Sequence, residues 1–340
     1  MTLRISARIE IIVITALTVA LLVATHLYVI LYSSASTDHT MRTIVVPKGA
    51  SFRVIAANLE KAGVIRDAGA FSFAARMSKA YRKVRAGEYE FRASMPLMEI
   101  LDALVEGRVK KYQVTIPEGY NVYEAAAALA QAGLVDEQEF LARARDARFV
   151  ASLGLEGQGV EGYLFPDTYQ FEKGMSADDM IRKMIAAFKS VYYPEIDAAA
   201  RARGMTLGKA VTLASIIEKE TGDGSERGLI SAVFHNRLKK RIKLQSDPTV
   251  IYGIKGFDGN LTKRHLLEKT PYNTYANYGL PPGPIANPGR AALKAAVEPA
   301  NADYLYFVSK NNGAHHFSTT LKEHNNAVNQ YQRRKGTLKP

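Results

Sequence analysis

The sequence contains no cysteine. Disulfide bonds and thiolate zinc sites are therefore excluded, and hydrophobic packing must hold the fold together. Also missing are the short motifs that bind phosphates or dinucleotides or carry a nucleophilic serine. No H-E-x-x-H zinc motif occurs, so we expect His315, His316 and His324 to be structural or hydrogen-bonding residues. These absences indicate neither a cofactor nor a metal site.

Acidic side chains are outnumbered: 33 aspartates and glutamates stand against 45 lysines and arginines, a formal net charge of +12 at pH 7. This charge suits nucleic acid, anionic lipid or an acidic polymer as a partner. The densest basic run is Lys239–Arg241 with Lys243. It follows a helical pattern, which favours a solvated helix end over a binding patch.

Charged side chains are absent from Ile11 to Tyr32, and the run is apolar. About 20 such residues can cross a bilayer as a helix. Arg4 and Arg8 precede the run, so the positive-inside tendency favours an N-terminus in the cytoplasm. A cleaved signal peptide is the alternative, because Ser33–Ser36 are small enough for a cleavage site.

The domain plan follows from this span. We expect a cytoplasmic N-terminus at 1–10, an uncleaved transmembrane helix at 11–32 and a linker at 33–42, with the remainder across the membrane. A translocated domain rarely meets nucleic acid, so we expect no nucleic acid partner. The 340 residues exceed what one core usually organises, which predicts two further folded units.

Two copies of a short unit lie 70 residues apart. Val46–Gly49 (VPKG) aligns with Ile116–Gly119 (IPEG), and the alanines and glycines that follow also match. Each copy reads as a strand, a Pro-x-Gly turn and a short helix that ends at glycine. A strand is expected between the two copies at 87–91 and a helix at 98–104. We therefore expect residues 43–158 to form a βα repeat domain that serves as a binding or spacing module rather than as an active site.

A loop at 156–159 marks the expected boundary, and residues 159–340 form the second domain. Helical patterns cover 177–189, 207–221 and 225–240, a hairpin joins 304–308 to 316–318, and a capping box opens a last helix at Thr320. The fold class predicted for the chain beyond the anchor is α+β.

One glutamate stands out on the predicted helix 207–221. At 100° per residue, Glu218 falls inside an apolar arc with Val211 and Ala214, whereas Thr212 and Ser215 fall on the opposite side. Burial disfavours the charged form and would raise the pKa of this carboxyl, as a general acid requires. The alternative is a structural ion pair.

That structural alternative would pair Glu218 with a cation such as Arg237. Glu220, at the margin of the arc, is expected at the surface. Tyrosines and asparagines crowd 272–278 beside a proline-rich loop, a composition that suits either a sugar cleft or an ordered surface loop.

The second domain resembles the membrane-anchored endolytic murein transglycosylases, the MltG or YceG-like family. The resemblance rests on Glu161–Tyr169 (EGYLFPDTY), Ala214–Glu220 (ASIIEKE), Val233–Leu238 (VFHNRL), Leu244–Tyr252 (LQSDPTVIY), Tyr272–Tyr275 (YNTY) and Gly279–Ile285 (GLPPGPI), followed by His315, Phe317, Thr319, His324 and Asn325. The anchor, the total length and a LysM-like region at 43–158 agree, although the repeat region matches only loosely.

The resemblance implies lytic cleavage of peptidoglycan between N-acetylmuramic acid and N-acetylglucosamine, leaving 1,6-anhydro ends. It places the catalytic glutamate on Glu218, which the helical arc also selects. Further residues are assigned to substrate contacts or cleft support: Glu161, Tyr163, Asn236, Gln245, Asp247, Tyr252, Tyr272, Asn273 and Tyr275. It also implies a cell inner membrane location with a periplasmic catalytic domain, and peptidoglycan synthases as candidate partners.

Two other functions remain open on the sequence. A hydrolytic muramidase would use Glu161 or Asp247 to activate water and would leave reducing ends. A non-catalytic wall-binding scaffold would act through the repeat domain. An aminodeoxychorismate lyase label carried by some family members is discounted, because that chemistry needs a pyridoxal phosphate lysine and nothing singles one out. An anchored endolytic enzyme would terminate nascent strands and thereby set their length.

Overall fold

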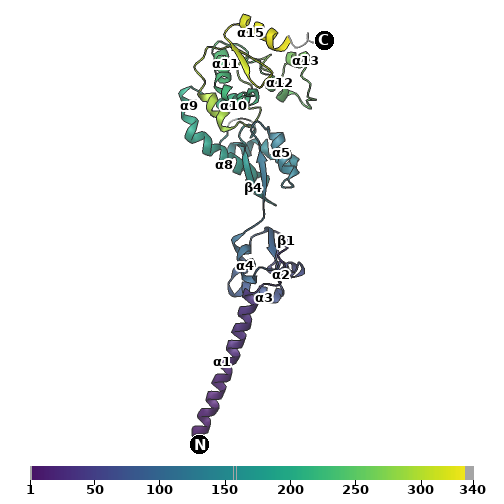
Figure 1. Cartoon of the computed structure of the whole chain (residues 1–340), viewed down its shortest axis with the longest axis vertical. Helices are drawn as coiled ribbons and strands as arrows, with labels where there is room; N and C mark the ends of the chain where they lie inside the picture. The colour runs from purple at the N-terminus through teal and green to yellow at the C-terminus, as the bar shows by residue number, and fades with distance from the viewer. Residues whose placement is uncertain (1, 156, 158, 334–340) are drawn as a thin grey trace. The chain divides into compact units, whose positions relative to one another are not determined.

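The computed structural model describes residues 2–155, 157 and 159–333 as a mixture of helices and three two-stranded sheets (Figure 1). This is the α+β class that the sequence predicts. Contacts divide the described chain into two compact units. The first runs up to Tyr112 and includes Glu172–Gly174, and the second comprises Gln113–Phe171 and the residues from Met175 onward.

The N-terminal helix α1 spans Thr2–Tyr32. Within it, Ile9–Tyr32 has a mean hydropathy of 2.2 and none of this stretch is buried. A stretch of this length and composition is compatible with a single-pass membrane anchor. The helix expected at 11–32 is therefore present.

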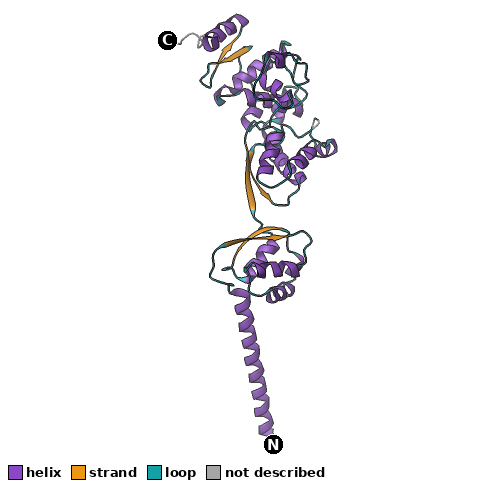
Figure 2. Cartoon of the chain, turned by 90° about the vertical axis from the view of Figure 1, so that its right-hand side faces the viewer, coloured by secondary structure: helices purple, strands orange, loops and turns teal. Residues whose placement is uncertain are grey.

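The first unit pairs β1 (Met41–Val46) antiparallel with β2 (Gly87–Arg92), in the register Met41 opposite Arg92. Figure 2 shows the strands in orange. Helices α2 (Phe52–Lys61), α3 (Ala68–Met77) and α4 (Leu97–Glu106) and the 3-10 turn η1 (Ala80–Arg82) complete the unit. Alternate side chains of β1 face its core, which is why Ile44 and Val46 are buried.

The repeat expected from the sequence is confirmed in outline. Strand β3 (Lys111–Ile116) and helix α5 (Val122–Gln131) lie 70 positions after β1 and α2 at both ends. Gly49 and Gly119, at the same place in the two turns, share a φ of +80°, a conformation that glycine adopts without strain. Both copies are therefore the same strand–turn–helix motif.

The two copies fall in different units. We expected both to form one domain ending at residue 158, but β3 pairs with β4 (Asp167–Glu172), a strand that the sequence analysis did not predict. Most of the second copy, with α6 (Glu137–Ala144) and α7 (Ala147–Ser152), therefore belongs to the second unit.

Helix α10 (Leu207–Glu220) runs through the centre of the second unit, where it packs against α9 (Asp197–Ala202), α11 (Arg227–Lys239), α12 (Asp247–Gly253) and α14 (Arg290–Val297). Its residues from Ala210 to Ile217 are all buried. Thr212 and Ser215, which lie opposite the apolar arc in the sequence pattern, are therefore buried as well. Their hydroxyls donate to the Gly208 and Thr212 carbonyls of the same helix, which lets a polar face lie inside the unit.

Some of the other elements of this unit match the sequence patterns. Helix α8 spans Ala177–Glu195, longer than the pattern predicted, and the 3-10 turn η2 (Gly224–Glu226) precedes α11. The expected hairpin is β5 (Tyr306–Ser309) with β6 (His315–Ser318). Short α13 (Lys263–Leu267), the capped α15 (Leu321–Val328) and η3 (Asn329–Arg333) complete the described chain.

Candidate active site

Glu218 lies near the C-terminal end of α10, and its side chain is 8% exposed. Its Oε2 accepts a hydrogen bond from the Gly289 backbone N–H at 3.0 Å, and Arg227 Nη2 lies 3.3 Å from its Oε1. Gly289 is the residue that precedes α14, and Arg227 is the first residue of α11. Three helices of one unit therefore place the carboxylate and both of its donors.

These contacts correct two expectations about Glu218. The side chain is buried as predicted, but its oxygens contact polar donors rather than apolar groups. The paired cation is Arg227 instead of Arg237. The Arg237 guanidinium donates to the carbonyls of Leu305 and Leu244, so it holds loops in place.

A second carboxylate, Glu118, lies beside this site and was missed by the sequence analysis. It belongs to the turn between β3 and α5, and its Oε2 is 3.8 Å from Arg227 Nη2. Gly289 has no side chain, and a Cβ there would collide with the Glu118 carboxyl group. Burial and the neighbouring Glu218 raise the pKa of Glu118, and Arg227 opposes the rise. Glu118 and Glu218 are therefore electrostatically coupled.

Asn287 holds this turn in place. Its backbone carbonyl accepts from Gly119 N at 3.0 Å, and both its backbone and side-chain amides donate to the Tyr120 carbonyl. Its Oδ1 accepts from Leu164 N at 3.0 Å. A fully buried amide with every group bonded is a rigid connection, so Glu118 is fixed against the segment that contacts Glu218.

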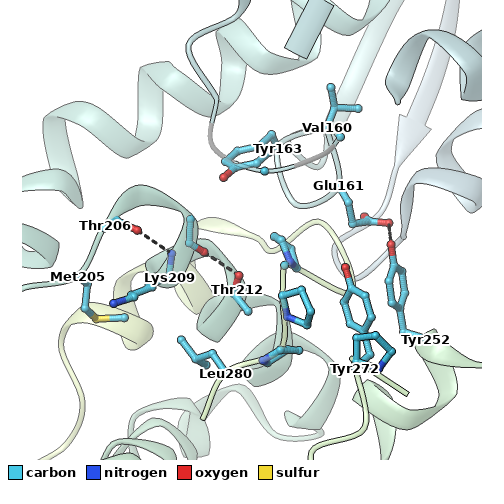
Figure 3. A pocket seen from close by; sticks show the side chains of 18 of the residues that line it. Val160, Glu161, Tyr163, Met205, Thr206, Lys209, Thr212, Tyr252, Tyr272 and Leu280 are labelled. Carbon is cyan, nitrogen blue, oxygen red and sulfur yellow. Dashed lines mark hydrogen bonds between the residues drawn. The ribbon is translucent and has the colours of Figure 1, made fainter. Parts of the chain in front are cut away.

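Four of the predicted substrate residues come together elsewhere in the same unit. Glu161, Tyr163, Tyr252 and Tyr272 line a cavity of about 1390 Å³ along the N-terminal half of α10 (Figure 3). Among the described residues that line it, Glu218 does not occur. The cavity wall also includes Lys209 of α10 and the proline-rich loop 280–284. Four of the predicted residues therefore share one cavity, and its described lining does not include Glu218.

Glu161 is the buried acid of this cavity. Its carboxylate accepts from Val122 N at 3.0 and 3.1 Å and from the Tyr252 hydroxyl at 3.0 Å. Burial raises its pKa from 4.5 to about 7, although these hydrogen bonds oppose the shift. The Tyr252 ring lies 4.9 Å from that of Tyr272. Aromatic rings beside a carboxyl group suit a sugar or a peptide.

We predict that Glu161→Gln changes how stability depends on pH. Because the folded-state pKa of about 7 exceeds the unfolded value of 4.5, the folded state binds more protons in this window and loses stability as pH rises through it. Glutamine keeps an acceptor for Val122 and carries no charge. The melting temperature of the variant should fall less between pH 4.5 and 8 than that of the wild type, measured by circular dichroism. Parallel melting curves at every pH would contradict this assignment.

Glu220 was expected at the surface, and this is wrong. It accepts from the Ser246 hydroxyl at 2.6 Å, and burial raises its pKa to about 6. Asp247, exposed at the start of α12, accepts from the Tyr275 hydroxyl at 2.6 Å. Gln245 is exposed next to this group, with a φ of +49° that is unusual for a residue with a side chain. These residues form a second polar cluster beside α10.

Asn236 and Asn273 contact the protein backbone. The Asn236 amide donates to the carbonyls of Ala302 and Tyr304. Asn273 is fully buried, and its amide donates to three carbonyls of the 265–268 segment. These contacts match cleft support, one of the two roles expected for both residues.

His315 also follows the expectation from the sequence. Its Nδ1 lies 2.7 Å from Glu226 Oε2, and its backbone N–H donates to the same carboxylate. Glu226 directly precedes Arg227, so this contact fixes the start of α11 at the Glu218 site. His315 is therefore a hydrogen-bonding residue that supports the position of Arg227.

The chain is similar to several known proteins over most of its length. A profile of the YceG-like family matches residues 44–330. The chain is 36% identical over 308 residues to the endolytic murein transglycosylase of Bacillus subtilis (strain 168), covering 86% of this chain and 85% of that protein. It is 30% identical over 321 residues to the endolytic murein transglycosylase of Streptococcus pneumoniae (strain ATCC BAA-255 / R6), covering 84% of this chain and 57% of that protein.

Among solved structures, the crystal structure of a yceG-like protein from Listeria monocytogenes matches with a TM-score of 0.59 and 34% identity, covering 84% of this chain and 98% of that one. The family profile and these relatives span both units of the chain. The chain belongs to the YceG-like family.

Proposed function

We propose that this protein is an endolytic murein transglycosylase in which Glu218 is the catalytic acid and base. The names of its relatives and the family support the activity. The observation that carries the site assignment is the buried Glu218 carboxylate, fixed by Gly289 and Arg227 beside a second carboxylate. A carboxyl group in such a position can exchange protons with a bound sugar.

The reaction needs two proton transfers at one side of the sugar. Protonated Glu218 donates its proton to the glycosidic oxygen, and the bond from that oxygen to the muramic acid C1 breaks. The muramic acid 6-hydroxyl then attacks C1, and its proton passes to the Glu218 carboxylate. The C–O bond that forms closes the 1,6-anhydro ring, Glu218 regains its proton and no water is consumed.

The donors to Glu218 determine which way its carboxyl group faces. Gly289 N–H holds Oε2 and Arg227 holds Oε1, so the two oxygens are not equivalent. After the first transfer Glu218 becomes an anion, and both contacts stabilise it until the second transfer. This arrangement lets one side chain act first as an acid and then as a base.

The other predicted residues have proposed roles away from the reacting bond. The cavity with Glu161, Tyr163, Tyr252 and Tyr272 is a candidate subsite for a further sugar or a stem peptide. Asp247, Tyr275 and Gln245 would contact the strand at the other cluster. Asn236 and Asn273 support the loops between them.

The N-terminal helix suggests where in the cell the proposed activity takes place. We propose that residues 11–32 span the cell inner membrane with residues 1–10 in the cytoplasm, so that residues after the linker 33–42 lie in the periplasm. The apolar stretch of α1 supports this. The LysM-like repeat would bind glycan, and the residues from 159 onward would carry Glu218. The enzyme would cut nascent strands next to peptidoglycan synthases and thereby limit strand length.

The test uses the full-length protein, purified in detergent, on isolated glycan strands. We expect internal cuts whose new ends are 1,6-anhydro sugars, one water lighter than hydrolysis products by mass spectrometry. Reducing ends would identify a muramidase and overturn the proposed reaction. Strand binding without cleavage would identify a binding scaffold.

A further inference from the structure

We propose that Glu118 is a second catalytic carboxyl group of this site, which stabilises positive charge on the reacting sugar while Glu218 transfers protons. The inference rests on the function proposed above. It concerns a residue that belongs to the repeat motif rather than to the helix carrying Glu218. The turn between β3 and α5 would therefore be part of the catalytic machinery.

The short distance between the Glu118 and Glu218 carboxyl groups supports a role in the same reaction. Arg227 Nη2 lies 3.3 Å from Glu218 Oε1 and 3.8 Å from Glu118 Oε2. One nitrogen that contacts both keeps these oxygens no more than about 7 Å apart. Paired carboxyl groups in glycosidases are separated by up to roughly 9.5 Å, so both groups are close enough to act on one sugar.

The Glu118 and Glu218 side chains differ in solvent exposure, which supports different roles for them. The Glu118 side chain is 51% exposed, whereas that of Glu218 is 8% exposed. Glu118 can therefore meet a polymer that arrives from solvent, whereas Glu218 is largely screened from solvent. The pair has one buried member and one member that is open to solvent.

Glu218 and Arg227 act on the charge of Glu118 in opposite directions. Of the influences on the pKa of Glu118, burial and Glu218 raise it and Arg227 lowers it. The repulsion from Glu218 disappears when Glu218 holds the catalytic proton, and Arg227 remains. Lys219, the other cation at this end of α10, donates to the Gly119 carbonyl of the same turn. When Glu218 carries the proton, Arg227 is the neighbour that favours the charged form of Glu118.

Glu118 stabilises charge during the reaction and is itself chemically unchanged. As the leaving oxygen takes the Glu218 proton and the bond to C1 breaks, positive charge develops on C1 and the ring oxygen. The fixed Glu118 carboxylate stabilises that charge until the 6-hydroxyl attacks C1 and returns its proton to Glu218. Glu118 forms no bond and exchanges no proton.

The repeat shows that this carboxylate is specific to the second copy. The same turn in the first unit carries Lys48 at the position of Glu118, between the matching proline and glycine. The backbone of the turn is common to both copies, with the same φ at Gly49 and Gly119. A structural need of the turn therefore does not explain the glutamate.

The experiment compares five single variants and one double variant of the full-length enzyme on glycan strands. Glu118→Gln keeps the shape but removes the charge, and we expect kcat to fall about 100-fold with KM changed less than about threefold. Gly289→Ala should have a similar effect, because its Cβ displaces the Glu118 carboxyl group while the N–H that bonds Glu218 remains. The matched control is Glu139→Gln, an exposed glutamate of α6.

The double variant Glu118→Gln with Gly289→Ala should be no slower than the slower single variant, since both changes remove one interaction. Formate should partly restore kcat to Glu118→Ala, which a purely structural role would not allow. Wild-type kcat in Glu118→Gln, with Glu218→Gln inactive, would overturn this inference and leave the proposed function intact. Full activity in Glu218→Gln would instead overturn the proposed function.

Discussion

Glu218→Gln is expected to lower kcat for glycan cleavage by about 1,000-fold or more, because an amide can neither give the first proton nor take the second. Glutamine has the same shape, and its oxygen can still accept from Gly289 N–H or Arg227. The folded state should therefore survive. The measurement is kcat on glycan strands, together with the melting temperature, which should stay within a few degrees of the wild type.

Glu220→Gln is the comparison variant for this prediction. It lies two residues further along α10, is also largely buried and carries a pKa raised to about 6. Its partner is Ser246, on a different side of the helix from Arg227. We expect it to lose less than about tenfold in kcat, since it would not transfer a proton to the sugar. The opposite ranking of the two variants would contradict the assignment of Glu218.

Gly162→Ala is expected to cause the largest loss of stability, about 3 kcal/mol. Gly162 has a φ of +86°, and a Cβ there would lie 2.6 Å from Pro284 and 2.8 Å from Val211 of α10. Neither neighbour can move easily, because one is a ring in a rigid loop and the other is fully buried in α10. For a unit of this size, the loss corresponds to a decrease in melting temperature of roughly 6 to 12 °C.

Gly133→Ala is the control variant, because it introduces the same kind of backbone strain as Gly162→Ala but no steric clash. Gly133 also has a positive φ, +68°, but no atom lies within 4 Å of the position a Cβ would take. We expect a loss of only about 1 kcal/mol from the left-handed conformation. Equal melting temperatures for the two variants would show that the packing of Gly162 against Pro284 and Val211 is not as tight as described.

Local patterns were enough to predict several elements. The bounds of α10 agree with its predicted range to one residue, because Thr206 caps its start and apolar residues recur along it. The capping box at Thr320 and the hairpin around Asn312 are equally local signals. The repeat predicted β3 and α5 from the positions of β1 and α2.

Long-range contacts account for what the sequence could not predict. The partner of Glu218 is set by how α11 begins after η2, which places Arg227 rather than Arg237 beside it. Glu118 lies 100 residues earlier in the chain, and the hydrogen bonds of Asn287 and Lys219 to its turn hold it at the site. The difference between Lys48 and Glu118 in otherwise matching turns was the one signal that could have identified it.

The helical arc selected Glu218 for a reason that proved incomplete. An apolar arc implies that the opposite side of α10 is solvated, yet Thr212 and Ser215 on that opposite side are buried. Hydroxyl groups that bond helix carbonyls or Ile285 N can face a protein interior, and a hydropathy pattern does not register this. The arc identified a buried glutamate, but not its polar surroundings.

The most direct test of the site is a crystal structure of Glu218→Gln with a bound glycan oligomer. The predicted result is a glycosidic oxygen within about 3 Å of the residue 218 side chain, with the muramic acid ring against Glu118. A strand that occupies the Glu161 cavity with no sugar in contact with residue 218 would contradict the assignment of Glu218 as the catalytic acid and base.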